Sequence, residues 1–504
     1  MRSVGRDRGL AKTVDWSLVI CWVVLILIGW ANIYASTLAS EPDSIFDFAS
    51  RSGKQFVWMI TALGIAGLVL FVIPPRLYEG LSLPIYLFTI ALLVAVIFLG
   101  IEVKGSRSWF ALGPVRFQPA EISKISTSLM LATVMSQLGY RIGRFRDFLI
   151  AAIIILFPML IIVLQSETGS ALVYVGFIFM LYREGLSGWL IFMIGMAILT
   201  FILTLTTSPF IAVLVLAGVA SLCISLYSDK FKSWILVCVP AIVILSFVPQ
   251  VLDVLTEWIV GVERLAEIAA LQEAGEVVEL PWIMKIKPIY ILLGASLAAM
   301  PFVIYNAFRE GNRFTYLALL SFIGGVLLVF STDFLFNNVL QDHQRKRIEV
   351  LLGMKEDPTG VGYNVNQSLI AIGSGGLTGK GYLNGTQTTL GFVPEQSTDF
   401  IFCTIGEEWG FLGAAGIILL YVFLIWRIIR NAERSREGFT RIYGYCVACC
   451  IFMHLFINIG MTIGLMPVIG IPLPFISYGG SSLWGFTAML FIFIALDRNE
   501  RKYF

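Results

Sequence analysis

The uncharged run "WSLVICWVVLILIGWANIYAS", Trp16 to Ser36, decides the class of this fold. Its length matches the ~20 apolar residues that an α-helix needs to cross the ~30 Å hydrocarbon core of a bilayer. Comparable runs recur along the chain, which has 504 residues, 58% of them hydrophobic and 13% charged. Because so few charged residues cannot cover a soluble globule of this size, the sequence predicts an integral membrane protein.

The apolar runs predict an all-α, polytopic helical bundle of about fourteen transmembrane helices. The predicted spans are 16-36, 55-73, 82-101, 122-140, 148-164, 170-182, 188-206, 209-227, 233-250, 288-307, 314-333, 401-426, 441-461 and 483-496. Lys and Arg gather before the first span, in every second connection and after the last span. Since basic residues in short loops favour the cytoplasmic side, both termini are expected there, and the segments 102-121, 334-400 and 462-482 are expected outside.

Charge and cysteine content exclude other classes of protein. The net charge of +2 is too small to indicate nucleic acid as a partner. All seven cysteines lie in or beside apolar runs, so the sequence predicts neither a disulfide framework nor a metal site. Cys446 and Cys449, although spaced as C-x-x-C, are interpreted as small helix residues.

The segment "VLQDHQRKRIEVLLG", Val339 to Gly353, concentrates charge in an otherwise apolar chain. It lies in the loop 334-400, which is far longer than the median connection of ~4 to 6 residues, and long ordered loops usually carry function. Considered without its family context, Asp342 is most simply interpreted as a solvated ion-pair partner of the cationic side chains that follow it.

Five separated motifs carry most of the unusual residues of the chain: "KGSRSWFALGPVRFQPAEISKI" at 104-125, "LQSETGSALV" at 164-173, "QDHQRKRIEVLL" at 341-352, "AIGSGGLTGKGYLNGTQTTLGFVPEQSTDFIF" at 371-402 and "GLMPVIGIPLPFISYGGSS" at 464-482. In this order they resemble the motifs of the SEDS family (shape, elongation, division and sporulation). The fourth motif resembles the elongation branch of the family rather than the division branch.

The resemblance implies a peptidoglycan glycosyltransferase for cell elongation and rod shape. Its substrate would be lipid II, a disaccharide-pentapeptide on undecaprenyl pyrophosphate, polymerised into β-1,4 glycan by an inverting displacement with one carboxylate base. It implies a class B penicillin-binding protein as partner besides membrane lipid, and a place in the bacterial inner (plasma) membrane with the active site outside. No cofactor is required by this scheme, and the use of a divalent cation is left open.

A lipid II flippase is the alternative function. A transporter is expected to show two related halves and polar residues near the middle of the membrane. The sequence shows no such internal repeat, and its polar residues gather at the outer face, which favours the polymerase.

The resemblance gives Asp342 the role of general base, because this residue matches the loop aspartate of the family. Arg345 and Lys380 are then expected to contact anionic substrate. The pair Gly379-Lys380 is not a phosphate loop, because the motif requires a glycine where this chain has Ser374 and a Ser or Thr where it has Gly381.

Two more groups on the predicted outer side are candidates for substrate binding. Glu121 and Lys124 are three residues apart and share a helix face at a depth where ionisable groups are costly unless they are paired or face a cavity. Their alternative role is a purely structural ion pair. Arg107 and Arg116 flank "SWFALGPV", where they would bind pyrophosphate or simply extend towards lipid headgroups.

The last motif contributes Ser477 and Tyr478, which would either bind glycan or satisfy backbone groups freed by the nearby prolines. His454 and Asn458, four residues apart in the predicted span 441-461, are interpreted as a hydrogen-bonding pair in helix packing rather than as a proton relay.

The chain departs from the family pattern in length. Members generally have roughly ten spans, and the aspartate loop follows the seventh, whereas here it follows the eleventh. We therefore expect a single membrane domain over 1-504, in which about four spans are inserted at 208-333 before the large catalytic loop 334-400. Within the insertion, 255-280 is predicted to form an interfacial or partner-facing outer helix.

Overall fold

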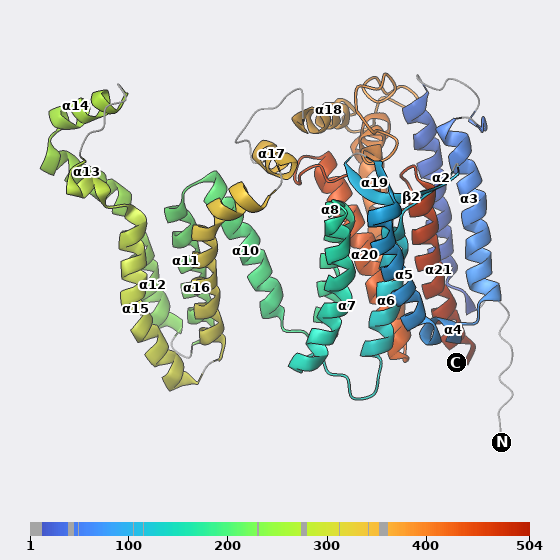
Figure 1. The fold of residues 1–504 in the computed structure, drawn as a ribbon, viewed down its shortest axis with the longest axis horizontal. Coiled ribbons are helices and arrows are strands. Elements are labelled where there is room, and N and C mark those ends of the chain that lie inside the picture. Colours follow the sequence, from blue (N-terminus) through green and yellow to red (C-terminus); the bar gives the residue numbers. More distant parts are fainter. Residues whose placement is uncertain are drawn as a thin grey trace. The chain divides into compact units, whose positions relative to one another are not determined.

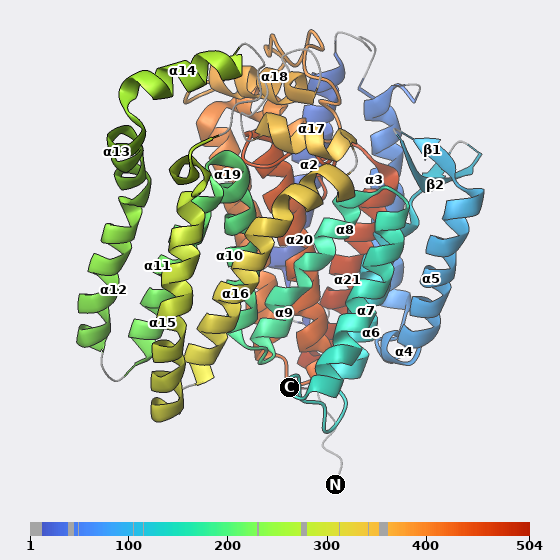
Figure 2. The ribbon, with the colours of Figure 1, turned by 60° about the vertical axis from the view of Figure 1, so that its left-hand side comes forward.

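The computed structural model describes residues 13–38, 45–48, 50–103, 105–113, 115–228, 231–273, 280–311, 313–340, 342–351 and 361–503. The described part of the chain is almost entirely helical (Figures 1 and 2). It divides into two compact units. Unit 1 comprises Met1–Ser187 and Lys346–Phe504, and unit 2 comprises Gly188–Arg345. Each unit is described below by itself.

Unit 1 is a bundle of long helices. Its helices are α2 (Trp16–Thr37), α3 (Arg51–Gly67, continued by the π-helix η1, Leu68–Val72), α4 (Arg76–Gly80), α5 (Ser82–Leu99), α6 (Pro119–Met135), α7 (Phe145–Leu164), α8 (Thr168–Val175), α9 (Phe177–Arg183), α18 (Val361–Ser374), α19 (Ile401–Arg434), α20 (Gly438–Thr462) and α21 (Gly480–Tyr503).

The core of unit 1 lies around α20 and α21, whose side chains are mostly buried. Helix α20 packs against α6, α19 and α21, and α21 also packs against α3. Small residues permit this close approach: a Cβ added to Gly444 would lie 2.5 Å from the Phe493 ring. The most buried helices therefore belong to the C-terminal third of the sequence, and α6 is held against them.

A small antiparallel sheet, not predicted from the sequence, lies in the segment expected to be an outer loop. Its strands β1 (Ile101–Val103), β2 (Ser106–Leu112) and β3 (Val115–Phe117) pair in the order β1-β2-β3. Burial alternates along β2, since Ser106 and Ser108 are buried while Arg107 is exposed, as the period of a strand requires. The described part of the chain is otherwise helical, as predicted, and this short segment adds three strands to the helical bundle.

At the end of unit 1 where α2 begins, a network of charged side chains ties three helices together. Asp15 caps α2 by accepting a hydrogen bond from the Ser17 N–H, and it also accepts from Arg427 at 2.8 Å, Asn431 at 2.8 Å and Arg501 at 3.1 Å. Burial of the Asp15 carboxyl raises its pKa, but the hydrogen bonds from Asn431 and Arg427 outweigh this effect and lower the pKa to about 2.

Unit 2 is built from a second set of helices. They are α10 (Gly188–Thr206), α11 (Pro209–Tyr227), α12 (Phe231–Ser246), α13 (Val248–Val260), α14 (Val262–Glu273), the short η2 (Trp282–Lys285), α15 (Pro288–Glu310) and α16 (Arg313–Phe334, continued by the π-helix η3, Leu335–Val339). Helix α17 (Asp342–Leu351) begins in unit 2 and runs across the boundary between the units.

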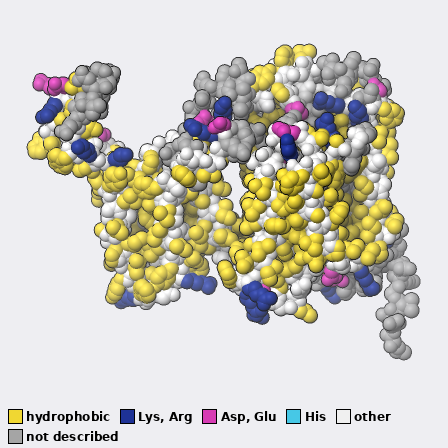
Figure 3. All heavy atoms as spheres, viewed as in Figure 1, with side chains coloured by type: hydrophobic (Ala, Val, Ile, Leu, Met, Phe, Trp, Pro, Cys, Tyr) yellow, Lys and Arg dark blue, Asp and Glu magenta, His cyan; other side chains and the backbone are white. Residues whose placement is uncertain are grey.

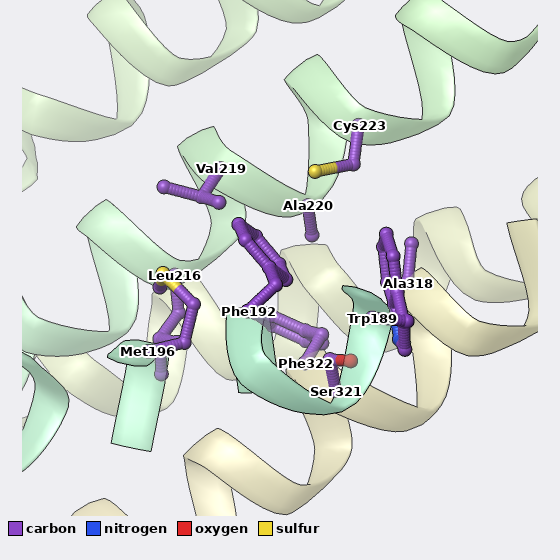
Figure 4. Close-up of a pocket in the computed structure, with 10 residues that line it drawn as sticks. All are labelled: Trp189, Phe192, Met196, Leu216, Val219, Ala220, Cys223, Ala318, Ser321 and Phe322. Carbon is purple, nitrogen blue, oxygen red and sulfur yellow. The ribbon is translucent and has the colours of Figure 1, made fainter. Parts of the chain in front are cut away.

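Helices α10, α11, α15 and α16 pack around an apolar core in unit 2. Next to it lies a pocket of about 20 Å³, lined by apolar side chains that include Phe192, Leu216 and Phe322 (Figure 4). A cavity of this volume has room for about one water molecule, so we interpret it as an imperfection of packing rather than a ligand site.

Apolar side chains cover the flanks of the helices in each unit, and charged side chains gather near the helix ends (Figure 3). Among the described residues, eleven helices are long and apolar enough to cross a membrane, or twelve if the α12–α13 pair, bent by 42°, forms one span. The predicted spans 122-140 and 170-182 correspond to the shorter α6 and α8–α9. The protein is therefore a multi-pass membrane protein, and the number of fourteen spans stays a prediction.

Two predicted helices have different bounds in the structure. The predicted span 233-250 is divided at Phe247, where α12 ends and α13 starts with Pro249 in its first turn. The predicted outer helix 255-280 is divided at Gly261, whose φ of 84° is typical of glycine, and residues 274–279 lie outside the described part of the chain.

Candidate active site

Lys124 and Glu121 form a buried ion pair at the start of α6. Pro119 occupies the first turn of this helix, where its missing N–H costs nothing, and Glu121 lies in the same turn, where a negative charge is favourable. The Lys124 ammonium donates to Glu121 Oε1 at 2.8 Å, and the two side chains are 1% and 4% exposed. The two side chains therefore share one helix face, as the three-residue spacing predicts, and they form a buried ion pair.

His454 of α20 completes this cluster. Its Nε2 lies 2.9 Å from Lys124 Nζ, and its Nδ1 lies 3.0 Å from the Pro472 carbonyl oxygen. The Phe486 ring of α21 packs edge-on against the imidazole, with ring centroids 4.7 Å apart, and its centroid is 4.8 Å from the ammonium. Three helices thus enclose one buried cation.

Residues 463–479, which we call the proline segment, connect α20 to α21 and depend on side chains for their hydrogen bonds. The Ile471, Pro472 and Pro474 carbonyls accept from Asn458, His454 and Tyr421, respectively. Prolines disrupt regular pairing, so these buried carbonyls need donors from the neighbouring helices. His454 and Asn458 therefore both bind this segment, which the prediction of a pair within helix packing did not specify.

Ser477 and Tyr478 join the proline segment to the end of residues 375–400, the glycine-rich loop that precedes α19. The Ser477 hydroxyl donates to the Thr398 carbonyl and accepts from the Leu473 N–H, each at 2.7 Å. The Tyr478 N–H donates to the Ser397 carbonyl, and its ring packs against Trp58, with centroids 5.0 Å apart. Of the two roles predicted for these residues, the geometry fits the binding of backbone groups.

Lys380 lies in a second charged cluster of unit 1. Its ammonium donates to Glu407 Oε1 at 2.6 Å and to Thr386 Oγ1 at 2.7 Å. Glu407 is fully buried and also accepts from the backbone N–H groups of Thr386, Gln387 and Thr388. One carboxylate of α19 therefore holds the glycine-rich loop in place, and two of the three donors of Lys380 are used within the protein.

Arg107 and Arg116 are carried by the small sheet, on strands β2 and β3. Both side chains are exposed, and Arg107 lies 3.7 Å from Glu102 in a solvent-exposed pair. The Arg116 carbonyl accepts from the Ser481 hydroxyl, which ties the sheet to the start of α21. The sheet, rather than an irregular loop, therefore determines where these two cations lie.

Asp342 is the first residue of α17 in unit 2, and its side chain is exposed. Arg345 lies one turn further along the same helix, with its guanidinium 5.4 Å from the centre of the Phe336 ring. An aspartate at the N-terminus of a helix is favoured by the helix dipole. Asp357, which the sequence suggests is a turn residue, lies outside the described residues.

The structure brings together Glu121 with Lys124, and Ser477 with Tyr478, within unit 1. The sequence did not predict that His454 contacts Lys124. A histidine inside an apolar span needs polar partners, and the proline segment that follows it closely could have indicated one of them. Within the described ranges, no three His, Cys, Asp or Glu side chains form a group that could hold a metal ion.

Comparison with known proteins identifies the family of this chain. The family model described as "Cell cycle protein", which covers FtsW, RodA and SpoVE, matches residues 15–257 and 289–502. Over 441 residues the chain is 30% identical to the peptidoglycan glycosyltransferase MrdB of Escherichia coli K12, covering 86% of this chain and 84% of that protein. Over 501 residues it is 29% identical to the peptidoglycan glycosyltransferase RodA of Treponema pallidum, covering 99% of this chain and all of that protein.

Solved structures share the fold. One chain of a peptidoglycan synthase complex aligns with a TM-score of 0.56 at 22% identity, covering 98% of this chain and 99% of that chain. The rod shape determining protein RodA of Thermus thermophilus aligns with a TM-score of 0.51 at 21% identity, covering 97% of each chain. The chain therefore belongs to the FtsW, RodA and SpoVE family of cell cycle proteins, the SEDS family.

Proposed function

We propose that this protein is a peptidoglycan glycosyltransferase that polymerises lipid II into β-1,4-linked glycan strands during cell elongation. The observation that carries this proposal is the 30% identity, over 86% of the chain, to a protein named as a peptidoglycan glycosyltransferase. The similarity to RodA of Treponema pallidum over 99% of the chain favours the elongation branch.

The proposed reaction is a single inverting displacement. The acceptor hydroxyl attacks the anomeric carbon of the donor, its proton passes to the Asp342 carboxylate, and the bond from that carbon to the pyrophosphate oxygen breaks. The α-linked donor becomes a β-linked product, so one general base suffices and no covalent intermediate is needed. The exposure of Asp342 supports this role, because a base must be reached by the acceptor.

The leaving pyrophosphate carries negative charge that cations can stabilise. Arg345 follows Asp342 by one helical turn, and Arg107 and Arg116 are exposed on the small sheet. Among the described residues, Glu407 and Thr386 occupy two of the three ammonium donors of Lys380. We propose each of these side chains as a contact for the pyrophosphate, and we propose that Ser477 and Tyr478 support substrate binding indirectly, by holding the backbone of the proline segment.

Glu121 and Lys124 have a different place in the proposal. The Lys124 side chain is 1% exposed, so a phosphate can contact its ammonium only after a conformational change. We propose that the pair binds substrate in such an opened state. A buried cation paired inside a membrane protein is costly to maintain, which supports a function beyond packing.

We further propose that the active site faces the outside of the bacterial inner membrane and that a class B penicillin-binding protein is the partner. The alternation of basic residues between connections supports the orientation. The partner is supported by the fold shared with one chain of a peptidoglycan synthase complex that coordinates polymerization and crosslinking. The spans within 208-333 are proposed as an insertion into the family core, and 334-400 as the catalytic loop.

Purified protein mixed with labelled lipid II in detergent tests this proposal. The polymerase should produce glycan strands that lysozyme digests, and heat-denatured protein should produce none. A flippase has no membrane to act across in detergent, so absence of glycan, together with transfer of lipid II between the leaflets of vesicles, would replace the polymerase with the transporter.

A further inference from the structure

We infer that His454 is a positioning residue for Lys124, acting as a neutral imidazole that carries its single proton on Nδ1. The inference rests on the proposed function in one respect only, namely that Lys124 binds substrate. It adds a residue of α20 to the site and links the buried cation to the proline segment.

The partners of the two ring nitrogens determine the protonation state. The Pro472 carbonyl oxygen, 3.0 Å from Nδ1, can only accept a hydrogen bond, so Nδ1 must donate. The Lys124 ammonium, 2.9 Å from Nε2, has no acceptor, so Nε2 must accept. One nitrogen donates and the other accepts, and the ring is therefore neutral.

His454 fixes the direction of the ammonium together with two other contacts. Glu121 accepts from Lys124 at 2.8 Å, and the face of the Phe486 ring lies 4.8 Å from the ammonium nitrogen. The same ring packs against the imidazole at an interplanar angle of 86°. Because all of these groups are buried, loss of the imidazole acceptor would leave one ammonium donor without a partner.

His454 also connects the cation to the segment that carries Ser477 and Tyr478. The imidazole is the shared link, because one nitrogen binds the cation of α6 and the other binds the Pro472 carbonyl. Movement of the proline segment away from α20 would break the Pro472 contact that selects the tautomer. The position of the cation and the conformation of this segment are therefore coupled through one ring.

The two hydrogen bonds of His454 determine which side chain can replace it. Glutamine offers a carbonyl oxygen that accepts from Lys124 and an amide N–H that donates to the Pro472 carbonyl. Leucine has a comparable size and offers neither group. His454→Gln should therefore keep the cation in place, whereas His454→Leu should not.

The histidine content of the chain permits a direct spectroscopic test. The protein has two histidines, His343 and His454, so the variant His343→Gln carries His454 as its sole histidine. Nitrogen-15 spectra of this variant, labelled at histidine, should show a neutral ring with the proton on Nδ1 at pH 7. Adding Lys124→Met should shift the Nε2 signal, which loses its donor, and change the Nδ1 signal much less.

An imidazolium, a ring protonated on Nε2, or an Nε2 signal that Lys124→Met leaves unchanged would overturn the inference. None of these spectra depends on catalysis, so they stand even if the protein makes no glycan.

The activity test uses the same detergent assay with the histidine at 343 restored. His454→Leu should lower kcat by roughly 10²-fold, the typical effect of misplacing a catalytic group by about 1 Å, while His454→Gln stays within about tenfold of the unchanged protein. Unfolding temperatures of both variants separate lost positioning from lost folding. Equal activity of the glutamine and leucine variants, at equal stability, would contradict the positioning role.

Discussion

Replacing Lys124 by methionine should destabilise the protein strongly. Methionine keeps most of the length of the lysine stem and removes the ammonium that lies 2.8 Å from Glu121 Oε1. The Glu121 carboxylate, 4% exposed, would then lose its cation in a buried position. Breaking a buried ion pair by removing one partner costs ~3–5 kcal/mol, because an uncompensated charge remains.

Removing both charges of the Glu121–Lys124 pair should lower the free energy of unfolding less than removing one of them. In the double variant Glu121→Gln, Lys124→Met no buried carboxylate remains, and replacing a whole buried pair by neutral groups of similar size is often close to neutral. We therefore expect a coupling of about 2 kcal/mol or more between the two sites, well above the few tenths found for independent sites.

Unfolding of the four proteins of this cycle, in one detergent and at one protein concentration, measures the coupling. Glycan synthesis by the same samples then separates the two roles proposed for the pair. If Lys124 serves the substrate, the double variant recovers stability but not activity. If Lys124→Met lowers the free energy of unfolding by less than about 1 kcal/mol, the buried ion pair is refuted. Full activity of the double variant would show that the pair has a structural role alone.

Three further predictions concern other parts of the chain. Glu407→Gln should destabilise the protein by about 1.5–3 kcal/mol, because it weakens the charged hydrogen bonds that Glu407 makes with Lys380 and with the loop backbone, and limited proteolysis should then cut the loop before α19. Folding lowers the pKa of Asp15 from 3.8 to about 2, so the ionised carboxylate adds about 2 kcal/mol to the free energy of unfolding. This contribution is complete above about pH 4 and is lost as the pH falls towards 2. The gap in unfolding midpoint between the unchanged protein and Asp15→Asn should therefore close over that range, and a constant gap would contradict the assignment. Deleting 208-333 with a short junction should leave measurable glycan synthesis, and a folded deletion without activity would mean that this part builds the substrate site.

The helices of the membrane bundle follow from local properties of the sequence. Long uncharged runs specify spans, and the three-residue spacing of Glu121 and Lys124 predicts that they share a face, so both features could be predicted without knowledge of tertiary contacts. The motifs also identified the family, because several of them occur in order along the chain.

Other features depend on contacts that no local pattern encodes. The strands of the small sheet are only three to seven residues long, too short for their alternation to be recognised within a polar segment. One partner of His454 is a backbone carbonyl in a segment beyond the end of α20, and Glu407 binds backbone N–H groups about 20 residues before it. Such pairings are set by how helices and loops pack, which the sequence of either partner does not specify.

The central claim, that Asp342 is the general base, is tested most directly by Asp342→Asn. This change keeps the size of the side chain and removes the proton acceptor, so glycan synthesis from labelled lipid II should fall by ~10² to 10⁴-fold. Stability should change by less than about 1 kcal/mol, since the side chain is exposed and an exposed charge gains only a modest stabilisation from the helix dipole. The matched control is Asp253→Asn, an exposed aspartate on helix α13 of the same unit, which should stay active. Asp342→Glu, which moves the carboxylate by one methylene, should recover little activity. The measurement is the rate of glycan synthesis by equal amounts of folded, detergent-purified protein. The account predicts a large loss of rate in Asp342→Asn and none in Asp253→Asn, and a near-normal rate in Asp342→Asn would contradict it.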